Sequence, residues 1–210
     1  MLDLLVLLFG SWFWRAHSLF IKGVLRAKGI QVGRNFYIEG VPRLKIRGKA
    51  GNIIIGNSVA ILGNIDLRNR ENGIIVFRDG VTIEGNCRFV SAREGRIDVG
   101  EGTIITAFAI FNGGADIMIG KQCVIGPRAS INANEHLFVR GKSIREQGFL
   151  HAPVWIGDGC WTGTGVVINK GVRLAPGTVV GALAVVTKDT EENGIYVGAP
   201  ARKIGERPGA

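Results

Sequence analysis

The chain has 210 residues, of which 46% are hydrophobic, and this composition argues against disorder and allows a sizeable core within one domain. Three cysteines, with no CxxC pair among them, argue against a disulfide framework or a zinc knuckle and indicate a reducing, cytoplasmic environment. The formal net charge of +9 favours an anionic partner, whether nucleic acid, an acidic lipid surface or a phosphate-bearing cofactor.

The first 14 residues, MLDLLVLLFGSWFW, are strongly apolar, but Arg15 ends this run before the roughly 20 residues that a membrane-spanning helix needs. The stretch also has no basic n-region and no small-residue cleavage site, so we expect neither a transmembrane span nor a cleaved secretory signal. Residues 2 to 28 instead predict a helix with one apolar face. That face consists of Leu2, Leu5, Phe9, Trp12, Phe13, Ala16, Leu19 and Phe20.

Basic residues accompany the apolar face of this predicted helix, at Arg15, Lys22, Arg26 and Lys28. Aromatic side chains beside cations suit a helix that lies in the interface of an acidic membrane. The competing interpretation is a helix that packs on the rest of the protein or on a neighbouring copy. The first interpretation predicts peripheral contact with an acidic membrane through residues 1–28, at the inner face of the cytoplasmic membrane.

From residue 31 onward, apolar residues recur at intervals of six, most clearly in VWIGDG CWTGTG VVINKG VRLAPG TVVGAL AVV. With short insertions the register runs through 21 positions, of which 20 are apolar, where the overall composition predicts about ten. The column consists of Val32, Ile38, Leu44, Ile55, Ile61, Leu67, Phe77, Ile83, Phe89, Val99, Ile105, Phe111, Ile119, Ile125, Ile131, Ile156, Thr162, Ile168, Leu174, Val180 and Val186.

A unit of six residues is too short for a helix and a loop, but it suits a short strand followed by a corner. Three such units form one coil of an all-β solenoid, with the apolar column inside. The small residues of each unit also face inward, which makes Cys87, Cys123 and Cys160 core residues. We therefore expect an N-terminal segment at 1–30, a repeat domain at 31–190 and a C-terminal tail at 191–210.

One long insertion interrupts the repeat, because Ile131 and Ile156 stand 25 positions apart instead of six. Residues 132–153 must leave the solenoid wall and return, and a long excursion from a rigid scaffold often carries function. This loop contains His136 and His151 and three cations, Arg140, Lys142 and Arg145. The cations either form a solvated loop or contact a cofactor phosphate or an anionic acceptor.

Four motifs accompany the repeats of residues 55 to 131: NANEH ending at His136, APVWIGDGCWTGTG at 152–165, VVGALAVVTKD at 179–189 and GAPARKI at 198–204. With these motifs the chain resembles the hexapeptide-repeat acyltransferases, in particular the sugar O-acetyltransferases, over about 170 residues. The resemblance implies a left-handed parallel β-helix, a homotrimer and acetyl-CoA as co-substrate.

The resemblance also implies that His136 is the catalytic residue, because the family places its catalytic histidine early in such a loop. Neutral imidazole can take a proton from a sugar hydroxyl that attacks a thioester. Asn112 and Glu135 are candidates for binding the acceptor, although neighbouring residues of an extended chain point in opposite directions, which separates Glu135 from His136. We interpret His151 as structural or peripheral and His17 as a packing residue.

For the co-substrate, the resemblance implies contacts along the coil edges between neighbouring protomers. The residues at the matching positions are Trp161, Thr164, Ala182, Thr187, Lys188 and Arg202. Two positions depart from the family pattern. Thr162 replaces a residue that is commonly aliphatic, and Leu183 follows Gly181-Ala182 where relatives have a small residue, so it is expected to narrow the channel locally.

The predicted function is the transfer of an acetyl group from acetyl-CoA to a hydroxyl of a sugar or lipid-linked saccharide. The alternatives are N-acylation of an amino sugar and a scaffold without enzymatic activity. A metal-dependent lyase on the same fold needs three converging histidines. Only three histidines exist, and one lies in the N-terminal segment, so no metal is expected. Nucleic-acid binding is not expected either, because the basic residues are dispersed and lack stacking aromatics.

Overall fold

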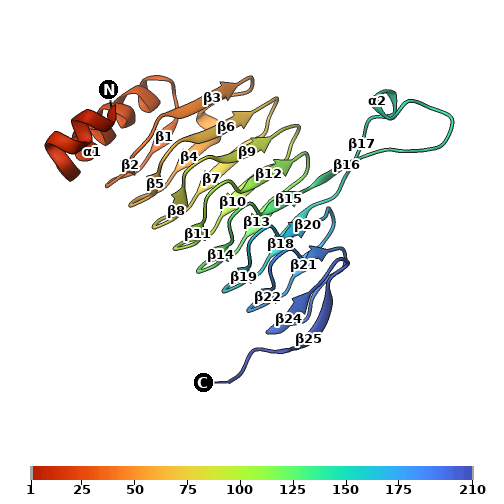
Figure 1. The fold of residues 1–210 in the computed structure, drawn as a ribbon. Coiled ribbons are helices and arrows are strands. Elements are labelled where there is room, and N and C mark those ends of the chain that lie inside the picture. Colours follow the sequence, from red (N-terminus) through yellow and green to blue (C-terminus); the bar gives the residue numbers. More distant parts are fainter. Residues whose placement is uncertain (1, 210) are drawn as a thin grey trace.

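The computed structural model describes residues 2–209, with side chains from residue 10 onward, as a helix followed by a stack of coils (Figure 1). The strands of successive coils pair in parallel and build three sheets, here named A, B and C. The left-handed parallel β-helix with an N-terminal helix, expected from the repeat and the resemblance, is confirmed.

The strands are short, as the six-residue unit requires. Sheet A contains β1 (Gln31–Val32), β4 (Ile53–Ile55), β7 (Ile74–Phe77), β10 (Arg96–Val99), β13 (Ile117–Ile119), β18 (Val154–Ile156) and β21 (Arg173–Leu174). Sheet B contains β2 (Tyr37–Ile38), β5 (Ala60–Leu62), β8 (Thr82–Glu84), β11 (Ile104–Ile105), β14 (Val124–Ile125), β19 (Trp161–Thr162), β22 (Val179–Val180), β24 (Gly194–Val197) and β25 (Arg202–Glu206). Sheet C contains β3 (Pro42–Ile46), β6 (Ile65–Asn69), β9 (Cys87–Ser91), β12 (Ile110–Gly113), β15 (Ser130–Asn132), β20 (Val167–Ile168) and β23 (Val185–Val186). A short 3-10 helix spans Ala50–Asn52.

The apolar column predicted from the repeat forms the core. Its members stand directly beside one another in the strand register, as Ile55 beside Phe77 in sheet A, and all are buried except Leu44, which is half-buried. Phe77 and Phe89 of one coil meet edge to face with ring centroids 4.9 Å apart, and Phe89 stacks on Phe111 of the next coil with centroids 4.5 Å apart. Burial of this column supplies the main driving force for stacking one coil on the next.

The polar member of the column, Thr162, is also fully buried. Its hydroxyl oxygen accepts a hydrogen bond of 3.0 Å from the backbone N–H of Gly126. The threonine that replaces the commonly aliphatic residue is therefore hydrogen-bonded inside the core. The three cysteines are buried as well, as expected. Burial raises the pKa of the Cys87 thiol to about 11, which makes this side chain a packing residue and not a nucleophile.

Helix α1 (Leu2–Ala27), with a non-helical glycine at Gly10, covers the first coil (Figure 1). The helix buries three side chains against this coil, those of Ser18, Ile21 and Leu25. The Ser18 hydroxyl accepts a hydrogen bond of 2.8 Å from the Ile38 N–H. The apolar face predicted from the sequence points the other way. Of its described members, Trp12, Leu19 and Phe20 are 70%, 71% and 68% exposed, Ala16 is exposed and Phe13 is half-buried. Leu2, Leu5 and Phe9 lie outside the described side chains.

One face of the helix thus packs on the solenoid, as the second interpretation of the N-terminal segment expects, and apolar side chains of the opposite face are exposed. His17 has the expected packing role, since its Nε2 lies 3.0 Å from the Gly40 carbonyl oxygen. Within the described part of the chain, no helix is both long enough and apolar enough to cross a membrane.

At the other end, the solenoid continues beyond residue 190, where the repeat was expected to stop. Strand β24 pairs in parallel with β22 and extends sheet B, and β25 folds back antiparallel onto β24. The backbone N–H of Thr190 and that of Ala201 donate to carbonyl groups of β21 and β23. The last strands of all three sheets thus have partners from the C-terminal residues.

The long insertion leaves the wall after β15, which ends at Asn132, and rejoins it at β18, which begins at Val154. It is an antiparallel hairpin of β16 (Asn134–His136) and β17 (Phe149–His151), with the short helix α2 (Ile144–Gln147) in its tip. Figure 1 shows this hairpin projecting from the side of the solenoid.

Candidate active site

The hairpin fixes the direction of its side chains through its register. Asn134 pairs with His151, Glu135 with Leu150, and His136 with Phe149. Paired residues share a face of an antiparallel ribbon, and faces alternate along each strand. One face therefore carries Asn134, His136, Phe149 and His151, and the other carries Glu135 and Leu150.

His136 lies on the exposed part of the first face, with its ring centroid 4.1 Å from that of Phe149. Glu135 points to the other side and forms an ion pair of 2.8 Å with Lys170, which follows β20. The expected separation of these two neighbours is thus present. Glu135 borders a small depression together with Asn132, Asn134, Asn169 and Lys170.

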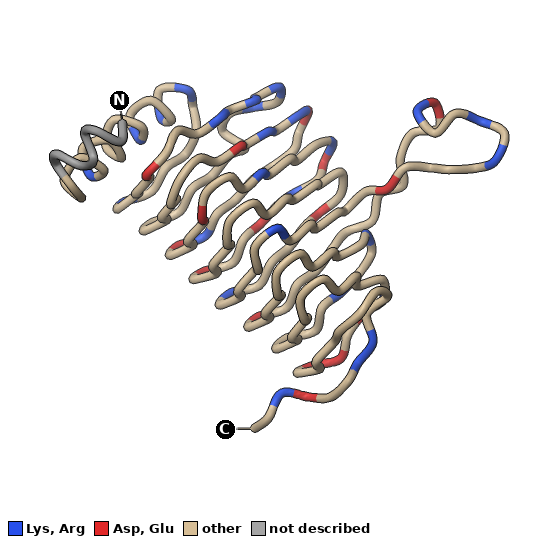
Figure 2. Tube along the Cα trace, viewed as in Figure 1, with Lys and Arg blue, Asp and Glu red and all other residues tan. Residues whose placement is uncertain are grey.

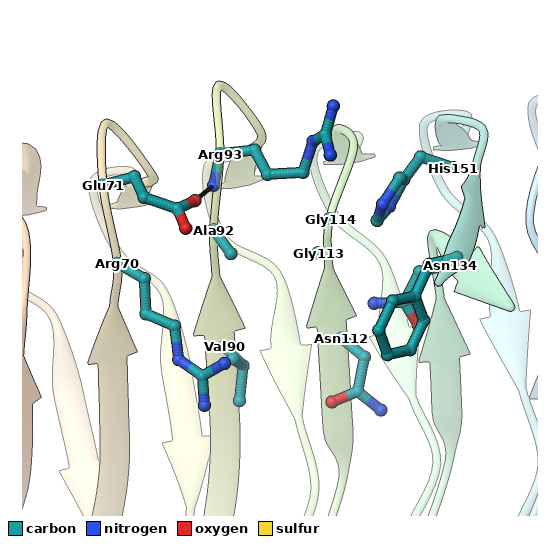
Figure 3. Close-up of a pocket in the computed structure, with 11 residues that line it drawn as sticks. Arg70, Glu71, Val90, Ala92, Arg93, Asn112, Gly113, Gly114, Asn134 and His151 are labelled. Atoms are coloured by element: carbon teal, nitrogen blue, oxygen red, sulfur yellow. Dashed lines mark hydrogen bonds between the residues drawn. The ribbon is translucent and has the colours of Figure 1, made fainter. Parts of the chain in front are cut away.

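A cavity of about 280 Å³ lies at the foot of the hairpin, where the strands of sheet C end (Figure 3). Asn112, the acceptor candidate from β12, lines it together with Asn134, Phe149 and His151 of the hairpin. The Asn112 amide nitrogen donates a hydrogen bond of 2.9 Å to the Asn132 side-chain oxygen, which holds the carboxamide in place. Asn112 and the first face of the hairpin are therefore brought together, whereas Glu135 is not part of this cavity.

His151 is more central than its interpretation as a structural or peripheral residue implied. Its ring occupies the space beside Gly114, where an added Cβ would lie 2.3 Å from Nδ1, so only glycine leaves room for the imidazole. Nδ1 is buried without a hydrogen-bond partner among the described residues. Burial, and in addition the charge of Arg93, lowers the pKa of His151, so the ring is neutral at pH 7.

Arg70 and Arg93 line the same cavity from the corners that follow β6 and β9. Figure 3 shows the Arg70 guanidinium beside Val90 and the Arg93 side chain extending toward His151. Neither arginine was singled out in the sequence. The strand register could have identified them. Asn69 pairs with Ser91, and Ser91 pairs with Gly113, so the residues that follow these three strand ends occupy neighbouring corners.

The residues expected to contact the co-substrate are all exposed and lie on two different edges of the solenoid. One edge is where the chain passes from sheet B to sheet C, here called the B–C corner. It carries Trp161 of β19, Thr164 just after β19 and Ala182 just after β22. Thr187 and Lys188 follow β23 at the opposite end of sheet C, on the hairpin side, and Arg202 lies in β25. One chain therefore does not gather all six beside His136.

Leu183, one of the departures from the family pattern, lies at the B–C corner with positive φ. It is 74% exposed, and its backbone N–H donates a hydrogen bond of 2.8 Å to the Thr164 carbonyl oxygen. Its side chain lies beside Gly165 of the preceding coil, where an added Cβ would stand 2.9 Å from Leu183 Cδ2.

Comparisons with known proteins bear on this arrangement. The family model of the bacterial transferase hexapeptide (six repeats) matches residues 153–188. The dTDP-4-amino-4,6-dideoxy-D-glucose acyltransferase of Escherichia coli is 30% identical over 159 residues, which cover 73% of this chain and 81% of that protein. The galactoside O-acetyltransferase of Escherichia coli strain K12 is 34% identical over 91 residues, 43% of this chain and 44% of that protein.

The chain spans about half of the length, between 43% and 51%, of the curated relatives that it matches first. Among solved structures, an N-acyltransferase from Bacillus cereus has a TM-score of 0.56 at 20% sequence identity, with 89% of each chain covered. A maltose O-acetyltransferase from Clostridium difficile has a TM-score of 0.54 at 23% identity, with 90% of this chain and 75% of that chain covered. These two structures share the fold.

Proposed function

Since the chain belongs to the hexapeptide-repeat acyltransferases, we propose that it transfers an acetyl group from acetyl-CoA to a hydroxyl of a sugar or lipid-linked saccharide. One observation carries this proposal. The hairpin presents His136 on the same face as Asn134, Phe149 and His151, directly beside the cavity that contains Asn112.

His136 acts as the general base in this proposal. Its imidazole takes the proton of the acceptor hydroxyl while the hydroxyl oxygen bonds to the thioester carbon. The carbon–sulfur bond then breaks, and the imidazolium returns the proton to the departing thiolate. Exposure of His136 suits this role, because the base must reach both a sugar in the cavity and a thioester that arrives from outside it.

Acetyl-CoA, the proposed co-substrate, is bound along the edges of the C-terminal coils. Trp161, Thr164 and Ala182 at the B–C corner contact its pantetheine arm, and Thr187, Lys188 and Arg202 lie further along the C-terminal coils. The cations Lys188 and Arg202 suit its phosphates. All six side chains are exposed and are therefore available for these contacts.

We further propose a homotrimer in which two protomers share each site. The six co-substrate candidates lie at two edges of the solenoid, so the hairpin of one chain needs the B–C corner of a neighbour. The outer face of sheet B supports this assembly. Ile104, Val124 and Trp161 are exposed there and stand side by side in the strand register, which is an apolar surface suited to burial between copies.

The proposal is tested by substitution of His136 with glutamine and measurement of CoA release in the presence of a panel of sugars and lipid-linked saccharides. Loss of a general base lowers the rate by about 10²- to 10⁴-fold, while binding of acetyl-CoA is unchanged. His17→Gln is the matched control, because His17 packs at the opposite end of the molecule, against Gly40. A wild-type rate for His136→Gln would refute the role of this residue.

N-acylation of an amino sugar is the second candidate, and it is favoured by the similarity to the Escherichia coli acyltransferase that is named for a 4-amino sugar. The two products differ in chemical stability, since an acetyl ester is cleaved by mild alkali and an acetamide is not. Treatment of the isolated product with mild alkali, followed by mass spectrometry, therefore decides between them. A chain that neither binds acetyl-CoA nor releases CoA with any acceptor would be a scaffold.

A further inference from the structure

The cavity at the foot of the hairpin contains two arginine side chains without protein partners. Among the described residues, neither the Arg70 nor the Arg93 guanidinium takes part in a hydrogen bond or an ion pair. The Glu71 carboxylate also lines the cavity, where it accepts a hydrogen bond from the backbone N–H of Arg93 (Figure 3). The one acid of the cavity thus neutralises neither guanidinium directly.

Two further acids border the adjoining depression. Glu94 accepts a hydrogen bond from the Asn72 amide, and Asp116 accepts one from the backbone N–H of Arg96, so neither forms an ion pair with Arg70 or Arg93. Figure 2 shows further Lys and Arg residues at the ends of β3 and β6, on the same side of the solenoid as the cavity. In the lining of the cavity itself, the two cations Arg70 and Arg93 outnumber the single carboxylate Glu71, and this surplus of positive charge attracts an anion.

We propose that this cavity recognises an anionic substituent of the acceptor, a carboxylate or a phosphate group, through Arg70 and Arg93. The inference rests on the proposed transferase function and names the class of its acceptor: an acidic sugar or a sugar phosphate. A guanidinium matches the geometry of both anions, because its N–H groups can donate two parallel hydrogen bonds.

The other walls of the cavity define the rest of the acceptor. A volume of about 280 Å³ is at the small end of ligand pockets and suits one sugar ring. Asn112 and Asn134 offer amide groups to its hydroxyls, and Phe149 offers an apolar ring face. Phe149 also contacts His136, so a ring whose anionic group is held by the arginines extends toward the proposed base.

The test compares glucuronate, glucose 6-phosphate and glucose as acceptors and as ligands. For wild-type protein, kcat/KM for at least one anionic sugar exceeds that for glucose by about 10- to 100-fold, the range that charge-assisted hydrogen bonds provide. Arg93→Gln and Arg70→Gln each lower kcat/KM for that anionic sugar to the value that the same variant shows for glucose. The two anionic probes show whether the cavity takes a carboxylate or a phosphate.

Arg34→Gln is the matched control, since it removes the same charge at an exposed position of the first coil, next to β1 and away from the cavity. Equal use of glucose and both anions, unchanged by either arginine substitution, overturns the proposal and leaves the transferase function intact. Direct binding of the three sugars, measured by calorimetry without acetyl-CoA, keeps the two questions separate.

If no sugar stimulates CoA release, the proposed function fails, and the binding measurement alone decides about the cavity. Binding of an anionic sugar in the millimolar range that weakens in Arg93→Gln supports the anion site. Failure of both anions to bind wild-type protein in this range overturns it. Thermal unfolding of each variant shows that the change is local.

Discussion

At the scale of single residues, Glu135 and His136 show how two neighbours acquire different surroundings. The alternation of side chains along β16 directs His136 to Phe149 and the cavity side, and directs Glu135 to Lys170. The carboxylate therefore does not orient the imidazole directly. The ion pair is also half-exposed, so it contributes little to stability, on the order of 0–1 kcal/mol.

Asp98 carries a pH-dependent part of the stability. Burial alone would raise the pKa of this carboxyl, but hydrogen bonds from Arg78 and Arg96, at 2.8 Å, outweigh it and lower the pKa below its ordinary value. A lowered pKa in the folded state stabilises the protein above the unfolded-state value of about 4. This contribution is lost as the pH falls through the folded-state value.

We therefore expect Asp98→Asn to lower the free energy of unfolding at pH 7 by about 1–3 kcal/mol, because two partly exposed arginines lose their charged partner. The difference from wild type shrinks as the pH falls below about 4, where the wild-type carboxyl also gains a proton. Urea unfolding at pH 7 and pH 3, at one protein concentration, measures both values. Glu192→Gln, an exposed carboxylate, is the control, and an equal difference at both pH values would contradict the argument.

At the scale of elements, helix α1 has two faces with separable roles. Leu25 and Ile21 cover the first coil, while Trp12, Leu19 and Phe20 are exposed. Exposed aromatic residues near Arg15 and Lys28 support the proposal that this face lies on an acidic membrane. Deletion of the whole segment would be a poor test, because it would also uncover the core of the first coil.

Point substitutions separate the two roles. Trp12→Ser with Phe20→Ser lowers binding to vesicles that contain acidic lipid, and leaves the unfolding temperature unchanged. Leu25→Ala creates a cavity and lowers the free energy of unfolding by about 2–5 kcal/mol, with vesicle binding retained. Vesicle co-sedimentation and thermal unfolding provide the two measurements. Equal vesicle binding by wild type and the double variant would exclude the exposed face as the contact.

The same scale shows what the sequence could and could not predict. A hydrophobic period of six is a local pattern, so the apolar column, the buried cysteines and the bounds of the insertion follow from it. The pairing of Asn134 with His151 joins residues 17 positions apart within a segment that has no repeat. Arg70, Arg93 and His151 line one cavity only after the four coils that contain β6, β9, β12 and β15 have stacked and Gly114 has left room for the ring. Such a site depends on register between coils, which the spacing alone does not specify.

At the scale of the whole molecule, the proposed sharing of each site between protomers predicts complementation. His136→Gln and Ala182→Phe chains are each inactive, the first without its base and the second with a blocked B–C corner. The two variants are mixed in equal amounts, unfolded and refolded together. In about a quarter of the interfaces of a random cyclic trimer, an intact hairpin then meets an intact B–C corner. About a quarter of the wild-type rate is therefore recovered.

CoA release by the mixture, compared with each variant refolded alone, measures this recovery. Two different affinity tags show that mixed trimers have formed. Mixed trimers without any activity would mean that both surfaces must be intact within one chain.

The covered ends of the solenoid have a consequence for how the protein behaves at high concentration. A stack of parallel strands offers unpaired N–H and C=O groups at its first and last coil, and such edges are templates for fibre growth. Here α1 lies over the first coil, and β25, Thr190 and Ala201 occupy the last one. These segments hinder elongation along the axis, which leaves the sides of the coil stack for association between copies, as the proposed trimer requires.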